Sequence, residues 1–507
     1  MDRRELFTLG RNALLGAALA PKPTPSEIAG FLLRSPDIEP KAAGPVQMTD
    51  AKCIQGNCDV VSNNKGKIFA AAIQYPTQDV EVWKYDLITT EKAVPTYFPL
   101  AGPNNHREAF KLITDSKDGI FAFGNTRNYD PHRNNIQVRA EGYSLKNGVW
   151  SRDWNWMTTT DGGFLPCASR AHAAFRNNDE TWAVWMEDYF YNSRPGPGKQ
   201  PGYYTENKIL LLRKDGWLEG SASVDSPAGH TMFPTMAEGN GHILSAFVVA
   251  KEPGAKRNLF LQTFSTQDLS TQSQHATEVI VTEDSKQIDV VMPTIVYNTI
   301  TKKFDIAITG IDENQRFMVL SLSVPPITQE EKITLPAIAL SDPDTEYADN
   351  PRITYNDGQT YVTFHTRVES SDKEGSVVKY NNYLDKQAKQ PTNTKSLPSP
   401  LDQHEFIGDL PVSKTGLSTA TEGVALISLL TFQRQEIPGS GQFLNNHQMC
   451  PLPSEPPRLT SRFLAPKNVF ITGNGPAPDS PYSQLFGYRP PSAMMPKEDK
   501  KPLPNSP

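Results

Sequence analysis

The sequence predicts an all-β protein, a β-propeller of seven four-stranded blades with six blades as the alternative. Proline and glycine are frequent, at 43 and 33 of 507 residues. Proline is excluded from helix interiors and central strands, so the chain must divide into short elements joined by turns. Many short runs alternate between apolar and polar residues, as strands with one buried face do. Similar runs also recur at a spacing that suits a four-stranded blade.

The recurring unit is an extended segment, a turn rich in Asn, Asp and Gly, and then a strand of apolar and small residues. Lys67–Ala72 and Gly241–Phe247 are two examples of this strand. The strands begin near residues 67, 119, 180, 241, 303, 359 and 423. A β-sandwich would show turn signals about every 8 to 12 residues without such a longer period. The spacing therefore predicts one blade per repeat, within a propeller domain over residues 49–480.

The amino-terminal residues resemble a twin-arginine export signal. Arg3 and Arg4 precede a weakly hydrophobic run that ends in the small-x-small sequence Ala18-Leu19-Ala20. Phe7 stands one place later than in the usual pattern. We interpret residues 1–20 as a signal and expect a periplasmic or secreted protein. The alternative is an amphipathic helix of a cytoplasmic or virion protein.

Proline-rich segments flank the repeats. Residues 21–48 are predicted to be a linker, and residues 481–507 a disordered tail. Val469–Thr472 is predicted as the strand that closes the ring onto the first blade, since closure removes exposed sheet edges. Cys53 and Cys58 either close a small disulfide loop or remain thiols.

The composition argues against several classes of protein. No run of the sequence approaches the roughly 20 apolar residues that a membrane-spanning helix needs. The 50 basic and 56 acidic residues give a formal net charge of −6, which argues against a large nucleic-acid-binding surface. The nine histidines form no short ligand motif, so we expect no metal site, and no other cofactor motif is present.

One blade resembles those of the sialidase-type β-propellers. It contains Pro351-Arg352-Ile353, then Asn356-Asp357-Gly358, then Tyr361-Val362-Thr363-Phe364. That group includes sialidases, related glycosidases and lyases, and non-catalytic lectins, so the resemblance implies a carbohydrate-related propeller. The aspartate box of the group is approached only at Thr159–Phe164, where the aromatic residue comes too early, and the group's first arginine element is missing. The resemblance therefore does not imply sialidase activity.

Candidate site residues gather on one predicted face, which we call the loop face. There the innermost strand of each blade begins and the second strand is joined to the third. Arginines pair with carboxylates and sulfates through two hydrogen bonds, and tyrosine rings stack on sugars. This combination predicts a site for an acidic glycan or a similar anionic polymer. The predicted ligand-binding residues are Arg107, Arg127, Arg170, Arg352, Tyr189, Tyr203, Tyr204, His230 and Asp349.

Four further residues on this face carry groups that transfer protons. Glu187 and Asp188 are predicted as acid and base, and His106 and His172 as proton shuttles near neutral pH. If the protein is an enzyme, these residues indicate a glycoside hydrolase or a polysaccharide lyase. The alternative function is a non-catalytic scaffold of an envelope or virion, whose loops would bind a protein partner.

Overall fold

The structure is a computed structural model, and the residues that it describes contain strands and no α-helix. All of them belong to the unit Gly44–Pro507. In this part of the chain no helix has the length and apolar character needed to cross a membrane. The described residues are 45–49, 54–65, 67–75, 80–86, 95–97, 105–115, 117–130, 135–158, 174–177, 181–192, 202–213, 218–224, 231–249, 256–271, 275–314, 316–328, 332–341, 346–356, 358–368, 422–430, 432, 434–437, 440, 447–452, 469–476 and 483–490.

The described strands form seven sheets, and the first three contain four antiparallel strands each in chain order. The first sheet comprises β2 (Ile54–Ser62), β3 (Lys67–Tyr75), β4 (Val80–Asp86) and β5 (Pro95–Tyr97). The second comprises β6 (Asn105–Thr114), β7 (Ile120–Asp130), β8 (Asn135–Lys146) and β9 (Val149–Thr158). The third comprises β10 (Ala174–Asn177), β11 (Thr181–Asn192), β12 (Gly202–Arg213) and β13 (Leu218–Val224).

The fourth sheet has six strands, because β18 pairs with β17 after a tight turn and β22 also pairs with β17, in parallel. It comprises β14 (Thr231–Gly239), β15 (His242–Val249), β16 (Asn258–Ser265), β17 (Thr277–Glu283), β18 (Lys286–Gln287) and β22 (Ile333–Pro336). The fifth comprises β19 (Asp289–Asn298), β20 (Lys303–Ile311), β21 (Phe317–Val324) and β23 (Ile338–Ala339). The sixth comprises β24 (Glu346–Asn356), β25 (Gln359–Val368), β26 (Glu422–Ser428) and β27 (Arg434–Glu436).

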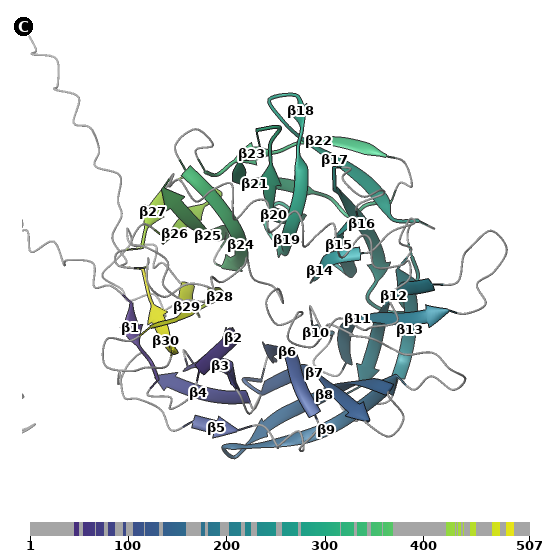
Figure 1. The fold of residues 1–507 in the computed structure, drawn as a ribbon, viewed down its shortest axis with the longest axis vertical. Helices are drawn as coiled ribbons and strands as arrows, with labels where there is room; N and C mark the ends of the chain where they lie inside the picture. Colours follow the sequence, from purple (N-terminus) through teal and green to yellow (C-terminus); the bar gives the residue numbers. More distant parts are fainter. Residues whose placement is uncertain are drawn as a thin grey trace, which may run out of the picture. The chain divides into compact units, whose positions relative to one another are not determined.

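The closing sheet combines strands from both ends of the described chain. Its order is β28 (Gln448–Pro451), β29 (Val469–Pro476), β30 (Ser483–Tyr488) and β1 (Val46–Gln47). The innermost strands β2, β6, β10, β14, β19, β24 and β28 contact one another in this order, and β28 contacts β2. The sheets therefore form a closed ring (Figure 1). The all-β propeller predicted from the sequence is confirmed.

Six of the seven repeat strands predicted from the sequence are second strands of their sheets, namely β3, β7, β11, β15, β20 and β25. The seventh prediction, near residue 423, is wrong. That strand is β26, the third strand of the sixth sheet, and the second strand of the closing sheet is β29. The error has a simple cause, since residues 369–421 separate β25 from β26 and this connection is almost as long as one repeat.

The ring is closed by the amino-terminal strand β1, which pairs with β30. The predicted closing segment, Val469–Thr472, lies in the same sheet as part of β29. Two predicted boundaries therefore shift, because β1 falls in the predicted linker and β30 in the predicted tail. Strands of two and six residues are too short to show the alternation on which the prediction relied.

Hydrogen bonds of residues 48 and 49 extend this closure. The backbone N–H of Met48 donates to the carbonyl of Leu485 at 2.7 Å. The hydroxyl of Thr49 donates to Oε1 of Gln484 at 2.9 Å and accepts from the backbone N–H of Leu485 at 3.0 Å. Met48 is buried in a cluster with Phe470 and residues of β2 and β3. The amino-terminal residues thus contribute to the core between the closing sheet and the first sheet.

A β-bulge interrupts the innermost strands β14, β19 and β24 at equivalent places. In each of them a residue with positive φ is followed by proline: Phe233 (φ 51°), Met292 (φ 50°) and Asn350 (φ 53°). Positive φ is uncommon outside glycine, and a bulge redirects the side chains beside it. The three bulges define positions that can be compared from sheet to sheet.

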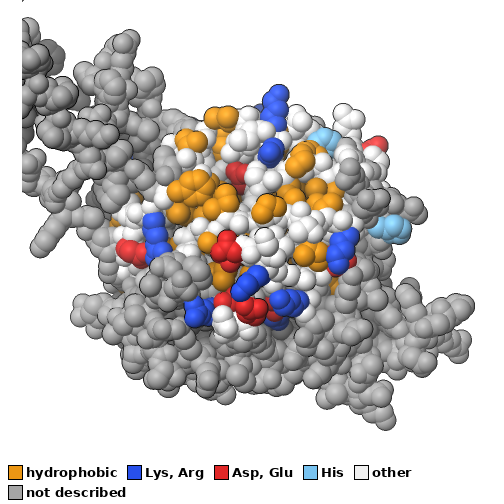
Figure 2. Space-filling model, turned by 90° about the horizontal axis from the view of Figure 1, so that it is seen from above, with side chains coloured by type: hydrophobic (Ala, Val, Ile, Leu, Met, Phe, Trp, Pro, Cys, Tyr) orange, Lys and Arg blue, Asp and Glu red, His pale blue; other side chains and the backbone are white. Residues whose placement is uncertain are grey.

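The outer edge of the propeller is visible where β17, β18 and β22 lie, at the top of Figure 1. Figure 2 shows this side, with hydrophobic side chains interspersed among Lys, Arg, Asp and Glu. One of the ion pairs here joins Lys286 of β18 to Glu313, with Nζ and Oε1 2.6 Å apart and both side chains exposed. This side therefore carries charges of both signs.

Candidate functional site

The bulge of the sixth sheet carries polar residues where two other sheets carry apolar ones. The bulge of β14 contains Met232-Phe233 and that of β19 contains Val291-Met292, whereas β24 has Asp349-Asn350. Two positions beyond the positive-φ residue, β14 and β19 have threonine, and β24 has Arg352. The propeller can thus build this bulge from apolar side chains, so its architecture does not require the charged residues of β24.

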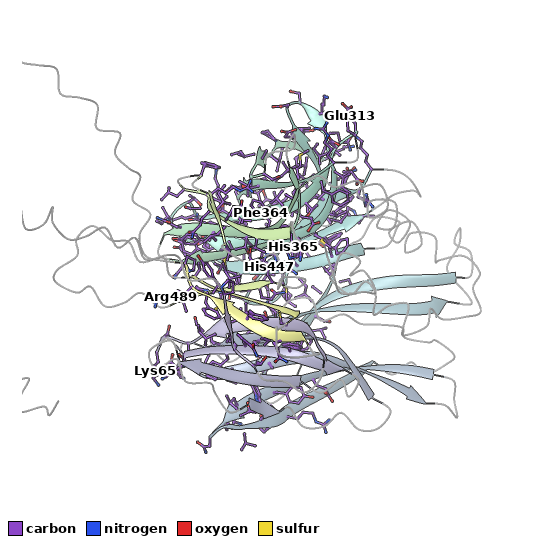
Figure 3. The ribbon with its side chains drawn as sticks, turned by 60° about the vertical axis from the view of Figure 1, so that its left-hand side comes forward. Lys65, Glu313, Phe364, His365, His447 and Arg489 are labelled. Carbon is purple, nitrogen blue, oxygen red and sulfur yellow. The ribbon has the colours of Figure 1, made fainter. Side chains whose placement is uncertain are left out.

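These residues belong to a buried polar cluster between the sixth sheet and the closing sheet. Asp349 and His365 are register partners on β24 and β25, and Nδ1 of His365 lies 3.3 Å from Oδ1 of Asp349. The ring of His447, just before β28, has its centroid 4.7 Å from that of His365. Figure 3 shows the two histidines beside each other inside the propeller, whereas Lys65 and Glu313 lie at its periphery.

The cluster contains a concentration of buried polar atoms without a hydrogen-bond partner. They are both carboxylate oxygens of Asp349, both amide atoms of Asn350, the hydroxyl of Thr363, and both ring nitrogens of His365 and His447. Asp349 and His447 are fully buried, and the side chain of His365 is only 10% exposed. A buried polar group without a partner costs about 1–3 kcal/mol, and more if it is charged. Such a concentration calls for an explanation, and a bound ligand, an ion or buried water would each supply hydrogen bonds.

Asp349 differs from the other buried carboxylates of the described residues. Each of those accepts hydrogen bonds from nearby donors, as expected for buried charge. Asp59 accepts from Lys111 and the backbone of Leu112, Asp115 from the backbone of Lys117 and Gly119, Glu141 from Tyr143 and Arg152, and Asp305 from Asn298 and Thr360. Asp349 instead has an imidazole at ion-pair distance and no hydrogen bond.

His447 is held in its neutral form. Burial lowers the pKa of His447 well below its usual value, and the positive charges of His365 and Arg352 lower it further. The backbone of Thr363 acts weakly in the opposite direction. The environment of His365 is different, because a carboxylate lies beside its ring.

Arg352 places a permanent positive charge beside this cluster. Its Nη1 donates to the carbonyl of Pro351 at 3.0 Å, and the side chain is partly exposed. A guanidinium carries five N–H donors and pairs with planar anions. The arrangement can thus bind an anion and move a proton. Among the described residues, no group of three or more His, Cys, Asp and Glu side chains is placed to hold a metal ion.

The structure brings two of the predicted ligand-binding residues, Asp349 and Arg352, into this cluster. Asp349 lies in the first half of β24, toward the loop face, and pairs with His365 of β25, whereas Arg352 lies near the middle of β24. The predicted roles of all these residues in ligand binding and proton transfer stay predictions. The backbones of His106, Arg107, Arg127, Glu187, Asp188, Tyr189, Tyr203 and Tyr204 lie on β6, β7, β11 and β12, with their side chains outside the described residues, and Arg170, His172 and His230 lie outside entirely.

Strand register pairs several of these untested residues. His106 is opposite Arg127 in the second sheet. In the third sheet Tyr203 is opposite Tyr191, and Tyr204 is opposite Phe190. The long strands β11 and β12 thus carry a group of aromatic residues close to their connecting loop.

Sequence reasoning missed His365 and His447. A comparison of repeats by register finds His365, because it stands opposite Asp349 where Thr309 stands opposite Val291. A histidine at a position that the fourth and fifth sheets fill with Val248 and Thr309 is the available signal. No such signal is available for His447, because this residue precedes a four-residue strand in the region where the repeat assignment was wrong.

Comparisons with known proteins give similarities of fold alone. No family model matches the sequence, and no curated protein matches it. An α-L-arabinanase of Penicillium chrysogenum is 10% identical, with a TM-score of 0.43 over 65% of this chain and 94% of that chain. A PL25 ulvan lyase is 8% identical, with a TM-score of 0.43 over 88% of this chain and 96% of that chain. A sialidase of Trypanosoma rangeli is 11% identical, with a TM-score of 0.38 over 68% of this chain and 59% of that chain. A puromycin-hydrolysing peptidase of Mycobacterium tuberculosis is similar to the same degree, being 10% identical with a TM-score of 0.44 over 90% of this chain and 57% of that chain. All these identities and scores are too low to carry an argument about activity.

Proposed function

We propose that the protein binds an acidic glycan on its loop face, with Asp349, His365 and His447 at the centre of the site and Arg352 beside them. One observation carries the proposal. The sixth sheet places uncompensated polar groups where the fourth and fifth sheets place apolar side chains. This substitution lowers stability, so a ligand that supplies the missing hydrogen bonds is the best physical reason for it.

The chemistry of the cluster favours an anionic ligand that also carries hydroxyl groups. Arg352 and His365 both lie close enough to His447 to interact with it electrostatically, and His365 lies beside the carboxylate of Asp349. Asn350 and Thr363 offer neutral donors and acceptors, which match sugar hydroxyl groups. Acidic sugars combine both features in one residue.

The same face supplies a longer binding surface in this proposal. Arg107 and Arg127 of the second sheet would contact further acidic groups, and Tyr203 and Tyr204 of the third would stack on sugar rings. Arg170, Tyr189 and His230 are proposed for the same surface, and Glu187, Asp188, His106 and His172 remain candidates for proton transfer. We also propose that residues 1–20 direct export, which would bring the protein to extracellular polymers.

Binding to a glycan array of sulfated, uronate-containing and neutral chains tests this function, followed by calorimetry with the best ligand. We expect acidic chains to bind and Arg352→Gln to weaken binding by about 10-fold or more, as for the loss of a charge-assisted hydrogen bond. Lys286→Gln is the matched control, because it removes an exposed positive charge on the edge of the propeller. Failure of every acidic chain to bind, or equal weakening by both variants, would overturn the proposal.

A further inference from the structure

Three exposed apolar side chains gather at the end of the propeller opposite the loop face. At this end, which we call the turn face, innermost strands turn into second strands, and in the sixth sheet the third strand turns into the fourth. Ile300 is 68% exposed in the turn between β19 and β20, and Leu430 and Phe432 are 65% and 50% exposed in the turn between β26 and β27. We propose that these three residues, the apolar patch, attach the protein to the surface of an anionic lipid membrane.

The two turns that carry the apolar patch meet at the start of β25. Ile300 lies against Gly358, since a Cβ on Gly358 would be 2.7 Å from Cδ1 of Ile300. The backbone N–H of Leu429, the residue before Leu430, donates to the carbonyl of Thr360 at 2.9 Å. Both turns thus contact the same short segment, Gly358–Thr360, which brings the three side chains to one place.

The turn that carries Leu430 and Phe432 also occurs in the fourth sheet, where it exposes a polar residue. The backbone N–H of Phe432 donates to the carbonyl four residues earlier at 2.8 Å, and φ of Phe432 is 53°. Leu269 of the fourth sheet makes the same bond at 3.1 Å with a φ of 56°. Leu269 is buried in a core cluster, and the exposed Gln267 stands where the sixth sheet has Leu430. The turn can therefore form without exposing apolar side chains.

The turn that carries Ile300 has polar counterparts in the first and second sheets. In each of the three turns, an Asn or Asp side chain accepts a hydrogen bond from the backbone N–H two residues later, which belongs to Ile300, Lys65 or Lys117. Both lysines are exposed, and Lys65 is labelled in Figure 3. The fifth sheet thus places an apolar side chain where two other sheets place a charged one. A surface that binds an apolar partner is the physical reason for such exposure.

Positive charge beside the apolar patch favours a negatively charged lipid surface as this partner. Lys302 and Lys303 follow Ile300 in the same turn, and both are exposed. Lysine side chains can reach lipid phosphates while apolar neighbours enter the boundary of the acyl chains. A stable protein partner would need about 800 Å² of surface from roughly 20 residues on this side, whereas a lipid surface accepts single inserted side chains. Three apolar side chains and two lysines at the ends of turns match the lipid surface.

This attachment is independent of the proposed function, because it uses the opposite end of the propeller. With the turn face on the membrane, the loop face points away from the lipid. The protein could therefore bind a soluble polymer and the membrane at the same time.

Co-sedimentation of the full-length protein with lipid vesicles tests the attachment. We expect the wild type to bind vesicles of phosphatidylglycerol and phosphatidylethanolamine about 10-fold more tightly than vesicles of phosphatidylcholine. Leu430→Ser with Phe432→Ser should weaken binding to the anionic vesicles by about 10-fold or more, because two apolar side chains no longer leave water. Lys302→Gln with Lys303→Gln should reduce the preference for anionic vesicles.

Ile338→Ser is the matched control, because Ile338 is 53% exposed in β23, at the outer edge of the fifth sheet. It should bind vesicles as the wild type does. Every variant keeps residues 1–20, so any binding by that apolar run is the same in all of them. Circular dichroism and thermal unfolding show whether the variants are folded, and Ile300→Ser repeats the test from a different turn.

Two results would overturn the lipid attachment. One is a wild type that does not bind anionic vesicles, or that binds them no better than the folded variants of the apolar patch do. The other is self-association of the wild type that Leu430→Ser with Phe432→Ser abolishes, in the absence of vesicle binding. That result would assign the apolar patch to a contact between copies of the chain.

Discussion

Asn350 adopts the same left-handed backbone conformation as Phe233 and Met292, although the three side chains differ in polarity and shape. The backbone of the bulge therefore does not determine the side chain at this position. What is particular to Asn350 is its surroundings, where Asp349 precedes it and His365 and His447 lie nearby. At the residue scale, the polar cluster is a feature added to a bulge that the propeller also builds with apolar residues.

Replacing Asp349 and His365 with the residues at the same positions in the fifth sheet tests whether the propeller fold needs the polar cluster. Asp349→Val with His365→Thr copies the pair Val291 and Thr309. We expect the double variant to be as stable as the wild type or about 1–4 kcal/mol more stable in urea unfolding, because buried charge is removed together with its partner. Glycan binding should be lost. A marked fall in the free energy of unfolding would show that the cluster supports the fold.

His447 makes stability depend on pH. Its pKa is lowered by burial in the folded protein, so the unfolded chain binds a proton first as the pH falls. Stability from this residue is therefore unchanged above about pH 6.5 and declines below it, by up to about 1.4 kcal/mol per pH unit until the folded pKa is reached. Urea unfolding at pH 7.5 and pH 5 should show a smaller difference for His447→Asn than for the wild type. An equal difference in both proteins would show that His447 is not the source of this pH dependence.

At the scale of elements, β1 is a short strand with a large structural role. Gly487 of β30 leaves room for Met48, since a Cβ on Gly487 would lie 2.7 Å from the sulfur of Met48 and 2.4 Å from the ring of Phe470. The fit of Met48 against β30 explains how so few residues fix the closing strand.

The variant Met48→Ala tests how much the contacts of residues 46–49 with the closing sheet contribute to stability. The side chain is 4% exposed, so its truncation should lower the free energy of unfolding by about 2–5 kcal/mol. Val149→Ala is the control, because Val149 is 68% exposed and its truncation should change little. Equal melting temperatures for the two variants would contradict the closing role of residues 46–49.

The elements also show what sequence patterns can and cannot reveal. Alternation over nine or ten residues identified β3, β20 and β25 correctly. The same criterion missed β1 and β28, because strands of two and four residues are too short to show an alternating pattern. Asp349 and Arg352 were candidates because polar residues stood at the start of a predicted innermost strand, and their role in a site stays a prediction. The partnership with His365 and His447 depends on strand register and on contacts between sheets, which no local pattern encodes.

At the scale of the whole molecule, closure by residues 46–49 limits where the chain can be shortened. The predicted signal ends at residue 20, so its removal would leave β1 intact. Fusing residues 1–25 to a reporter should cause export, and Arg3→Lys with Arg4→Lys should abolish it. Fractionation of the cells measures the outcome. Export that is insensitive to the two substitutions would contradict the twin-arginine interpretation.

The pairing of β1 with β30 also has a mechanical consequence. Because the first and last described strands are neighbours in one sheet, a force that pulls them apart acts first on this pairing. Among the described residues, two register pairs, the hydrogen bonds of residues 48 and 49 and the packing of Met48 oppose it. Once they separate, the closing sheet loses its outermost strand, and the remaining sheets can unravel one after another from the two ends. Under tension, we expect the pairing of β1 with β30 to break at a low force and the remaining sheets then to unfold one after another.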